Sequence, residues 1–547
     1  MGLRWHVCFT GFFSNLLELE RRFELFATDD TTLQFRLDRL LRLNPRLVLH
    51  RLRGNFAILA LDQENQRLWA RRDRLGAHTL YLARHCEGTR AWVIGNSAAE
   101  VLLASRQPFD EDPEYIAAYF ARHGKVPMGC SPFRTLQAVV PGELIEIQGD
   151  SVQRERSPIA INSRANPTDD AEAIEQFKTL LDNSVRQCLP PHADTAVMLS
   201  GGLDSGPVAL LADRHAKGAG RGLRPISWSL RDFPEADESV WTGQMARQLS
   251  ESVIWLECST MLPYSDLENT PVNPEAPGYN PFRALINQCY RSAAERGCDV
   301  ILNGNAGDDL YHPYPLLYRG YWKHREWAFL LEDLSYSVRR GGLRMLRFKK
   351  PLRQLLTWPF AGWHKPRPPA WMTDHAVSQL REPEVWPPEC AEHPFPAYAE
   401  QLYGPSMTQG RAIELHQSTA FGVERRDPFH NEELVEFMLN APFSFSFRHH
   451  RSKWIMREAM KGMLPERLRL KRRTGVLNSF YLAGKVANRR AIYQLLFDRH
   501  REWQRWVKPA VVSSILEDGH DTGAKATLVD QCIGYVLWLN YWTTRTA

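Results

Sequence analysis

The sequence feature that most constrains this chain is the segment 196–212, AVMLSGGLDSGPVALLA. Its four leading apolar residues predict a buried parallel strand, and Pro207 near the start of the next apolar run predicts a helix that begins there. Glycines beside a helix N-terminus let a bulky anion approach free N–H groups. The segment therefore predicts a phosphate-binding turn, although an ordinary strand-to-helix turn is the alternative.

Asp204 makes this turn unusual. A carboxylate beside phosphate oxygens is repulsive unless a cation lies between them, so the turn predicts Mg²⁺ as well as a nucleotide. The Walker spacing of two glycines and a Lys-Ser/Thr pair is absent from the sequence, which argues against transfer of a γ-phosphate.

Length and composition fit two globular domains. The chain has 547 residues, of which 44% are hydrophobic and 24% charged, and its net charge of +5 does not suggest nucleic-acid binding. Nine scattered cysteines without a Cys-x-x-Cys pair predict neither a disulfide framework nor a zinc site. We expect a cytoplasmic protein with no signal peptide and no membrane span.

Residues 1–155 contain short β-type runs at 56–61, 68–70, 91–94 and 144–147, and helical spacing at 33–43. This half is predicted to be an α+β domain with antiparallel sheets. A Ser/Asn/Pro-rich stretch at 156–170 is the predicted linker to a second domain, 171–547.

The second domain repeats a strand, loop and helix pattern. Strands are expected at 225–230 and 299–302 and helices at 170–187, 240–249 and 284–296, which is the doubly wound α/β arrangement. Asn303, Gly304, Asn305 and Asp308 follow the second of these strands. Because ligands bind at the carboxyl ends of such strands, we interpret this cluster as a second Mg²⁺-pyrophosphate ligand set, with a simple turn as the alternative.

Several segments carry a resemblance to known families. The first turn looks like the Ser-Gly-Gly-x-Asp-Ser loop of ATP pyrophosphatases. The segments 52–57, 70–76, 94–97 and 140–143, and later 422–429, 453–460 and 470–475, are similar in order to glutamine-dependent asparagine synthetases. The resemblance implies an N-terminal glutaminase-like sandwich of the Ntn type and an adenine nucleotide α-hydrolase-like ligase domain.

The resemblance also implies site residues. The ATP and pyrophosphate set would be Leu199, Ser200, Gly201, Gly202, Leu203, Asp204, Ser205, Leu230, Asn303, Gly304 and Asn305, with Asp204 and Asp308 on the metal. Either Lys471 or Arg473 would be the cation that faces the nucleotide. Glu424 could be catalytic or could form a structural ion pair with Arg426. Asn305 stands where the synthetases have Glu, so a role for that acid does not carry over.

The glutaminase-like domain departs from its family at the nucleophile, which is normally a cysteine immediately after the initiator Met. Gly2 takes that place, and Cys8 lies in the apolar run 5–9, where we expect a small buried side chain. The nitrogen nucleophile would then be an amine already on the substrate or one supplied free.

The closest resemblance is to the macrolactam-forming cyclases of lasso peptides, on the missing cysteine, the Pro-rich run 269–277 and the segment 470–484. It implies a ligase that forms AMP and pyrophosphate, with ATP and Mg²⁺ as cofactors. It would join an Asp or Glu side chain of a precursor peptide to the peptide's N-terminal amine, alongside a leader-binding protein and a leader peptidase. A ligase of the asparagine or β-lactam synthetase kind acting on a small molecule, and an inactive scaffold, are the alternatives.

Residues 311–398 are the part that the resemblance explains least. This range is predicted to be a peptide-binding insertion. Basic and apolar residues interleave at 339–353, a stretch that could hold nucleic acid, lipid or an acidic peptide, or could be a solvated helix packed on its apolar side.

Overall fold

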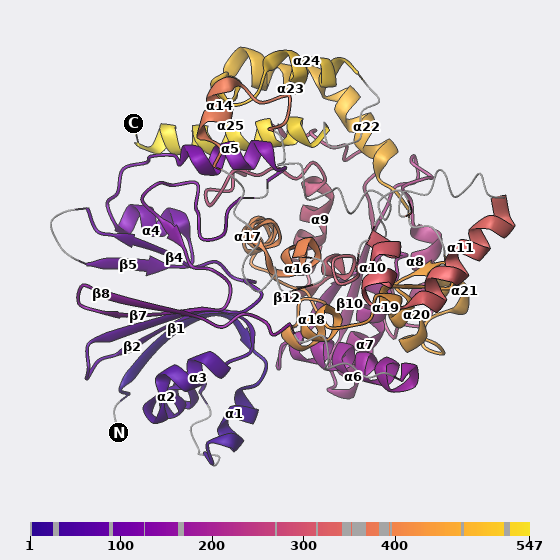
Figure 1. Cartoon of the computed structure of the whole chain (residues 1–547), viewed down its shortest axis with the longest axis horizontal. Coiled ribbons are helices and arrows are strands. Elements are labelled where there is room, and N and C mark those ends of the chain that lie inside the picture. The colour runs from indigo at the N-terminus through magenta and orange to yellow at the C-terminus, as the bar shows by residue number, and fades with distance from the viewer. Residues whose placement is uncertain are drawn as a thin grey trace.

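The computed structural model describes residues 3–25, 32–86, 91–124, 126–161, 169–267, 271–312, 316–341, 352, 368–381, 393, 396–471, 475–518 and 526–546. Figure 1 shows an N-terminal β-sandwich beside an α/β unit, with helices of the C-terminal region lying above both.

The N-terminal sandwich has two antiparallel sheets. One has the order β1 (Trp5–Phe13), β2 (Gly54–Asp62), β3 (Arg67–Arg72), β7 (Glu143–Gln148) and β8 (Ser151–Arg156), and the other β5 (Trp92–Gly95), β4 (Tyr81–Arg84) and β6 (Gln137–Ala138). Alternating apolar residues of both sheets, among them Leu82 and Ile145, form the core between them. Helices α1 (Leu16–Arg22), α2 (Leu33–Leu43) and α3 (Pro45–Arg51) cover the outer face of the larger sheet (Figure 1).

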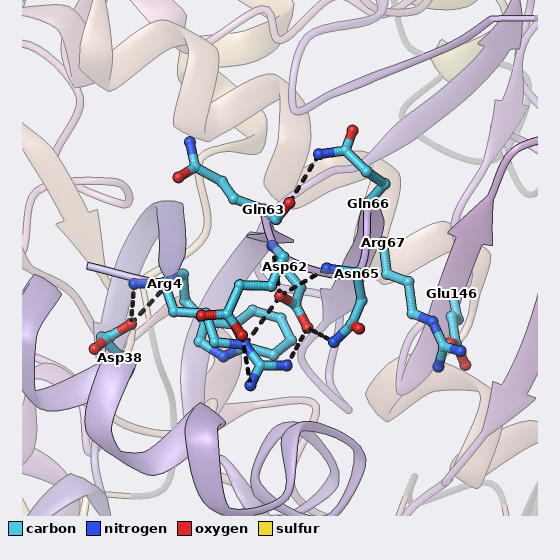
Figure 2. Close-up of polar contacts among 10 residues, drawn as sticks. Arg4, Asp38, Asp62, Gln63, Asn65, Gln66, Arg67 and Glu146 are labelled. Atoms are coloured by element: carbon cyan, nitrogen blue, oxygen red, sulfur yellow. Dashed lines mark hydrogen bonds and ion pairs between the residues drawn. The ribbon is translucent and has the colours of Figure 1, made fainter. Parts of the chain in front are cut away.

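An ion pair closes the edge of this sheet where β1 meets β2. Figure 2 shows Arg4 against Asp62, with distances of 3.0 and 2.7 Å to its two carboxylate oxygens. Asp38 of α2 accepts from the main-chain nitrogens of Arg4 and Trp5. The hydrogen bond from Arg4 lowers the pKa of Asp62 to about 2. The contacts tie helix α2 to the sheet and fix the start of β1.

The second domain is built on a parallel sheet of order β11 (Ile254–Glu257), β10 (Leu223–Ser229), β9 (Thr195–Met198), β12 (Val300–Leu302) and β13 (Glu424–Arg426). Helices α6 (Asp170–Cys188), α7 (Ser205–Gly218), α8 (Ser239–Ala246) and α9 (Arg283–Ala294) accompany it. The chain moves outward from β9 to β11 and then returns to the other side of β9. The topological switch point therefore lies between β9 and β12, which is where such sheets bind ligands.

The remaining helices surround this sheet and reach the sandwich. They are α10 (Leu317–Lys323), α11 (Trp327–Gly341), α14 (Asp374–Gln379), α16 (Pro396–Tyr403), α17 (Pro405–Thr419), α18 (Glu432–Leu439), α19 (Phe443–Ser446), α20 (Trp454–Ala459), α21 (Glu466–Arg469), α22 (Asn478–Ala487), α23 (Arg489–Tyr493), α24 (Pro509–Glu517) and α25 (Ala526–Thr546), with the short hairpin β14 (Phe447–Arg448) and β15 (Arg451–Ser452).

The two domains share a hydrophobic core. Helix α5 (Pro113–Ala121) of the sandwich packs against α25, and α4 (Ala98–Ala104) belongs to the same hydrophobic cluster. The Pro-rich run lies between them, because Trp538 and Trp542 both donate to the main-chain oxygen of Pro274, and Glu275 accepts from Ser97 at the start of α4. The sandwich is therefore held to the ligase-like domain by buried apolar area and by buried hydrogen bonds.

Most elements predicted from the sequence are confirmed, including the helix at 33–43 and the strand and helix around Ser200. Strands β11 and β13 were not predicted. The expectation that Cys8 is buried was wrong, because its side chain is exposed on β1. Most of the basic stretch 339–353, and residues 162–168 of the linker, lie outside the described residues. No helix in the described ranges is long and apolar enough to cross a membrane.

Candidate nucleotide and metal site

The switch point brings the two predicted loops into contact. A Cβ on Gly304 would lie 2.8 Å from the nitrogen of Ser205, and one on Gly307 would lie 2.6 Å from Cγ of Asp204. Real Cβ atoms do not approach other atoms so closely, so the loop after β12 fits against the loop after β9 only because these residues are glycine. The sheet topology thus makes one site of two segments a hundred residues apart.

Two serines close the first loop on itself. Ser205 Oγ accepts from the nitrogen of Ser200 at 3.0 Å and lies 2.9 Å from Ser200 Oγ. A Cβ on Gly201 would lie 2.3 Å from Cβ of Trp241, so this glycine is also required. The side chain of Asp204 makes no capping hydrogen bond at the start of α7. This side chain therefore leaves the first N–H groups of the helix uncapped, and such groups can bind an anion.

Lys453 joins the two carboxylates that the sequence predicts as metal ligands. Its Nζ lies 2.5 Å from Oδ2 of Asp204 and 2.5 Å from Oδ1 of Asp308. Burial raises the pKa of Asp204, and the ammonium of Lys453 opposes that rise. Burial also acts to lower the pKa of Lys453, but the two carboxylates outweigh it and raise this pKa. The site thus keeps three charges close together on one side of the sheet.

The residues present fit a divalent cation beside phosphate. Asp204 Oδ1 is buried and has no hydrogen-bond partner, while Oδ2 of the same group and Asp308 converge on a single positive charge. No group of three or more His, Cys, Asp or Glu ligands occurs among the described residues. Two carboxylates with substrate phosphates completing the shell are typical of Mg²⁺ rather than of a metal held by protein alone.

Other predicted residues lie around the same loop. Lys471 Nζ lies 3.0 Å from the main-chain oxygen of Gly201 and 2.7 Å from Glu238 Oε1. In the second loop, Asn303 is buried and its side-chain oxygen accepts from the main-chain nitrogen of Asn305. Asn305 itself is exposed. Leu199, Leu203 and Leu230 are buried at or just after strand ends. Gly202 donates to Ser200 Oγ at 3.3 Å. Arg473 lies outside the described residues.

Glu424 is not brought to this loop. Its two carboxylate oxygens accept from Arg426 at 2.9 and 2.8 Å, and Arg426 also donates to the main-chain oxygen of Cys188. The guanidinium lies 4.7 Å from the ring centroid of Phe12 in the sandwich. This position suits the structural ion pair, the second of the two roles considered for Glu424.

Sequence reasoning missed Lys453 and Glu238 as site residues. Lys453 has a left-handed backbone, with φ of 57°, at the residue between hairpin β14–β15 and helix α20. Glu238 accepts from the nitrogen of Gly475 as well as from Lys471, so it holds the segment after Lys471 against the first loop. Neither contact leaves a spacing signal, since both join residues more than two hundred positions apart.

Fold and loop together define an ATP-pyrophosphatase-like domain joined to an amidotransferase-like sandwich. Family models agree with this: the asparagine synthase model matches residues 176–544, and the glutamine amidotransferase domain model matches residues 6–157. The chain therefore belongs to the asparagine synthase family, and its sandwich is an Ntn-type glutamine amidotransferase domain by fold.

Individual relatives are distant. The chain is 21% identical over 436 residues to asparagine synthetase [glutamine-hydrolyzing] 3 of Bacillus subtilis, covering 76% of this chain and 66% of that protein. It is 24% identical over 160 residues to asparagine synthetase [glutamine-hydrolyzing] 1 of Saccharomyces cerevisiae, covering 28% and 27%. The matches thus span two thirds or less of these relatives' lengths. The solved structure of a U34-tRNA thiolase, NcsA of Methanococcus maripaludis, aligns at 15% identity. The alignment covers 49% of this chain and 86% of that chain, with a TM-score of 0.21.

Proposed function

We propose that this protein is an ATP-dependent, AMP-forming peptide macrocyclase of the lasso-peptide kind. It would adenylate an Asp or Glu side chain of a leader-cleaved precursor peptide and join it to the peptide's N-terminal amine. The observation that carries the proposal is the convergence of Asp204 and Asp308 on one cation position beside the N-terminus of α7.

In the first step, a carboxylate attacks the α-phosphorus of ATP and pyrophosphate leaves. Negative charge develops on the pyrophosphate and must be stabilised. The N–H groups at the start of α7 would hold the departing pyrophosphate, and the ammonium groups of Lys453 and Lys471 would offset its charge. Mg²⁺, held by Asp204 and Asp308, would supply further charge stabilisation when bound. Gly201 and Gly304 let the two loops pack closely around this position, because a Cβ at either residue would meet Trp241 or Ser205.

In the second step an amine displaces AMP from the acyl group. An α-amine has a pKa of about 7.7–8.0, so a minority is neutral near pH 7 and a weak base suffices. Since amine and acid belong to one peptide, the protein's main task is to hold that peptide folded until they meet.

The N-terminal sandwich supports an amine from the substrate rather than from glutamine. Cys8 lies in the middle of β1, where it is paired with Leu59 of β2, and its backbone is part of the sheet. A glutaminase nucleophile of this fold needs a free α-amine as its base, which a mid-strand residue lacks.

The test is mass spectrometry of a candidate precursor, trimmed of its leader, with ATP and Mg²⁺. Such a precursor would be sought among short genes beside the one that encodes this chain, together with a cysteine protease. We expect loss of one water and a blocked N-terminus, with AMP and pyrophosphate as products. Cys8→Ala should not change the rate, and glutamine should not stimulate it. Amidation of a free carboxylate with ammonia or glutamine would instead indicate the small-molecule ligase, and no ATP turnover with any acid would indicate a scaffold.

A further inference from the structure

One cavity of the described structure shares no residue with the nucleotide site. It measures about 520 Å³, within the range of small-molecule sites. Its lining comes from five parts of the chain: the end of α5, the segment before α9, and helices α17, α22 and α25. The sandwich and the ligase-like domain therefore both contribute to it.

Aromatic rings form much of its wall. Tyr119, Tyr279, Phe282 and Tyr481 line it. Their faces carry partial negative charge and attract cations. Among the described residues that line the cavity there is neither Lys nor Arg. Arg283, next to it, is paired with Asp266 at 2.9 Å, and its guanidinium lies 5.1 Å from the ring centroid of Tyr279, so the rings of Tyr119, Phe282 and Tyr481 are the ones left for a ligand.

One buried carboxylate lies in this wall. Asp530 is 9% exposed, and its Oδ1 accepts from the hydroxyl of Tyr264 at 2.6 Å. Its Oδ2 has only a long contact, 3.5 Å, with the hydroxyl of Tyr481. Lys485 also acts on Asp530 electrostatically, but its Nζ donates to the main-chain oxygen of Asp518. The carboxylate thus has acceptor capacity left.

A neighbouring group is also left without a partner. Gln531 is 6% exposed and lines the cavity, and its Nε2 donates to the main-chain oxygen of Tyr119. Its Oε1 is buried with no hydrogen-bond partner, and so is the hydroxyl of Tyr279. A buried acceptor without a donor is costly, so Gln531 Oε1 favours a ligand that donates a hydrogen bond, whereas the Tyr279 hydroxyl could donate or accept.

We infer that this cavity is a subsite for a basic side chain of the peptide substrate, one that carries a guanidinium or ammonium group. Its donors would reach Asp530 Oδ2 and Gln531 Oε1, and its alkyl stem would lie along the tyrosine rings. The volume leaves space for part of the adjoining peptide. That the ligand belongs to a peptide rests on the proposed function, whereas the preference for a cation rests on the cavity alone.

The test measures binding of a probe without ATP and without ring closure. Its result can therefore be read even if the cyclisation assay fails. Nα-acetyl-arginine amide and the uncharged isostere Nα-acetyl-citrulline amide are titrated separately into the full chain by calorimetry. We expect the arginine probe to bind roughly tenfold more tightly, as hydrogen bonds to a charged group allow.

Two variants locate the binding. Asp530→Asn keeps the shape and removes the charge, so the arginine preference should fall to about twofold or less. Gly410 lines the cavity, and a Cβ there meets nothing within 4 Å, so Gly410→Phe should fold and block the entry of both probes, with Gly410→Ala as the matched control. Asp150→Asn, an exposed carboxylate on the sandwich, should keep the preference. Equal binding of the two probes to the wild type, or a preference that survives Asp530→Asn or Gly410→Phe, would overturn the inference.

Discussion

Lys453 donates a hydrogen bond to Asp204 although 249 positions separate them in the chain. The contact exists because helix α20 begins beside the carboxyl end of β9, where the first loop also lies. The ammonium occupies the same small region in which two carboxylates would meet Mg²⁺. Lys453 thus pairs with both acids, and in the proposed function it would stand close to the phosphates of a bound nucleotide.

Lys453→Met should reduce AMP formation by roughly 100-fold, because an ammonium beside the developing pyrophosphate charge is lost from a buried site. The measurement is ATP consumption with a peptide substrate, followed by chromatography of AMP. Lys178→Met is the control, since Lys178 is half-buried on α6, far from the loop, and forms an ion pair with Glu175. A variant with more than half of the wild-type rate would show that Lys453 is structural.

Asp204→Asn and Asp308→Asn should each abolish turnover while the fold is retained. The charge stabilisation lost with either carboxylate corresponds to several kcal/mol. Circular dichroism and thermal unfolding check the fold, and AMP release checks the activity. Asp309→Asn is the neighbouring control: Asp309 accepts from Gln401 at 2.7 Å rather than from Lys453. Full activity in either of the first two variants would place the metal elsewhere.

The overall arrangement of the fold and the two loops could be predicted from sequence, because the Ser200 and Asn303 loops each follow a short apolar strand. The role of Lys453 could not be predicted, because it depends on how α20 packs against a loop far away in the chain. Strand β13 was missed because Glu424, Arg425 and Arg426 are all charged, which is not the pattern of a buried strand. Their charges are paired at the sheet edge, so the strand forms.

The stability of the protein should depend on pH through Asp530. Burial raises the pKa of this carboxyl to about 7, although the hydroxyls of Tyr264 and Tyr481 and the charge of Lys485 oppose the rise. A raised carboxyl pKa means that the folded state binds the proton more tightly than the unfolded chain, so stability falls as pH rises from about 4 through about 7.

Asp530→Asn removes the titrating carboxyl group and with it the loss of stability at high pH. Its melting temperature should exceed that of the wild type at pH 8, and the gap should close towards pH 5. The difference corresponds to up to roughly 4 kcal/mol at pH 8. Calorimetric melting curves at both pH values provide the measurement. A gap that does not change with pH would mean that Asp530 is ionised at low pH in the folded protein.

Glu275→Ala should weaken the attachment of the sandwich. Glu275 accepts from Ser97 Oγ at 2.7 Å and from the nitrogen of Ala98, so its loss leaves buried donors at the start of α4. The expected cost is about 1–3 kcal/mol. Hydrogen exchange should rise in α4 and in the facing part of α25, whereas Glu100→Ala, exposed on the same helix, should not change it. Unchanged exchange in α4 would show that apolar packing alone holds the domains.

In the proposed reaction, the peptide's own carboxylate is activated as an acyl adenylate and then captured by the peptide's own amine. This reaction is tested most directly with a precursor peptide whose acceptor side chain carries ¹⁸O in both carboxylate oxygens. We expect AMP that contains one ¹⁸O, unlabelled pyrophosphate, and a cyclic peptide that keeps the other ¹⁸O in its new amide. Unlabelled AMP, or ADP with phosphate, would contradict the proposed function.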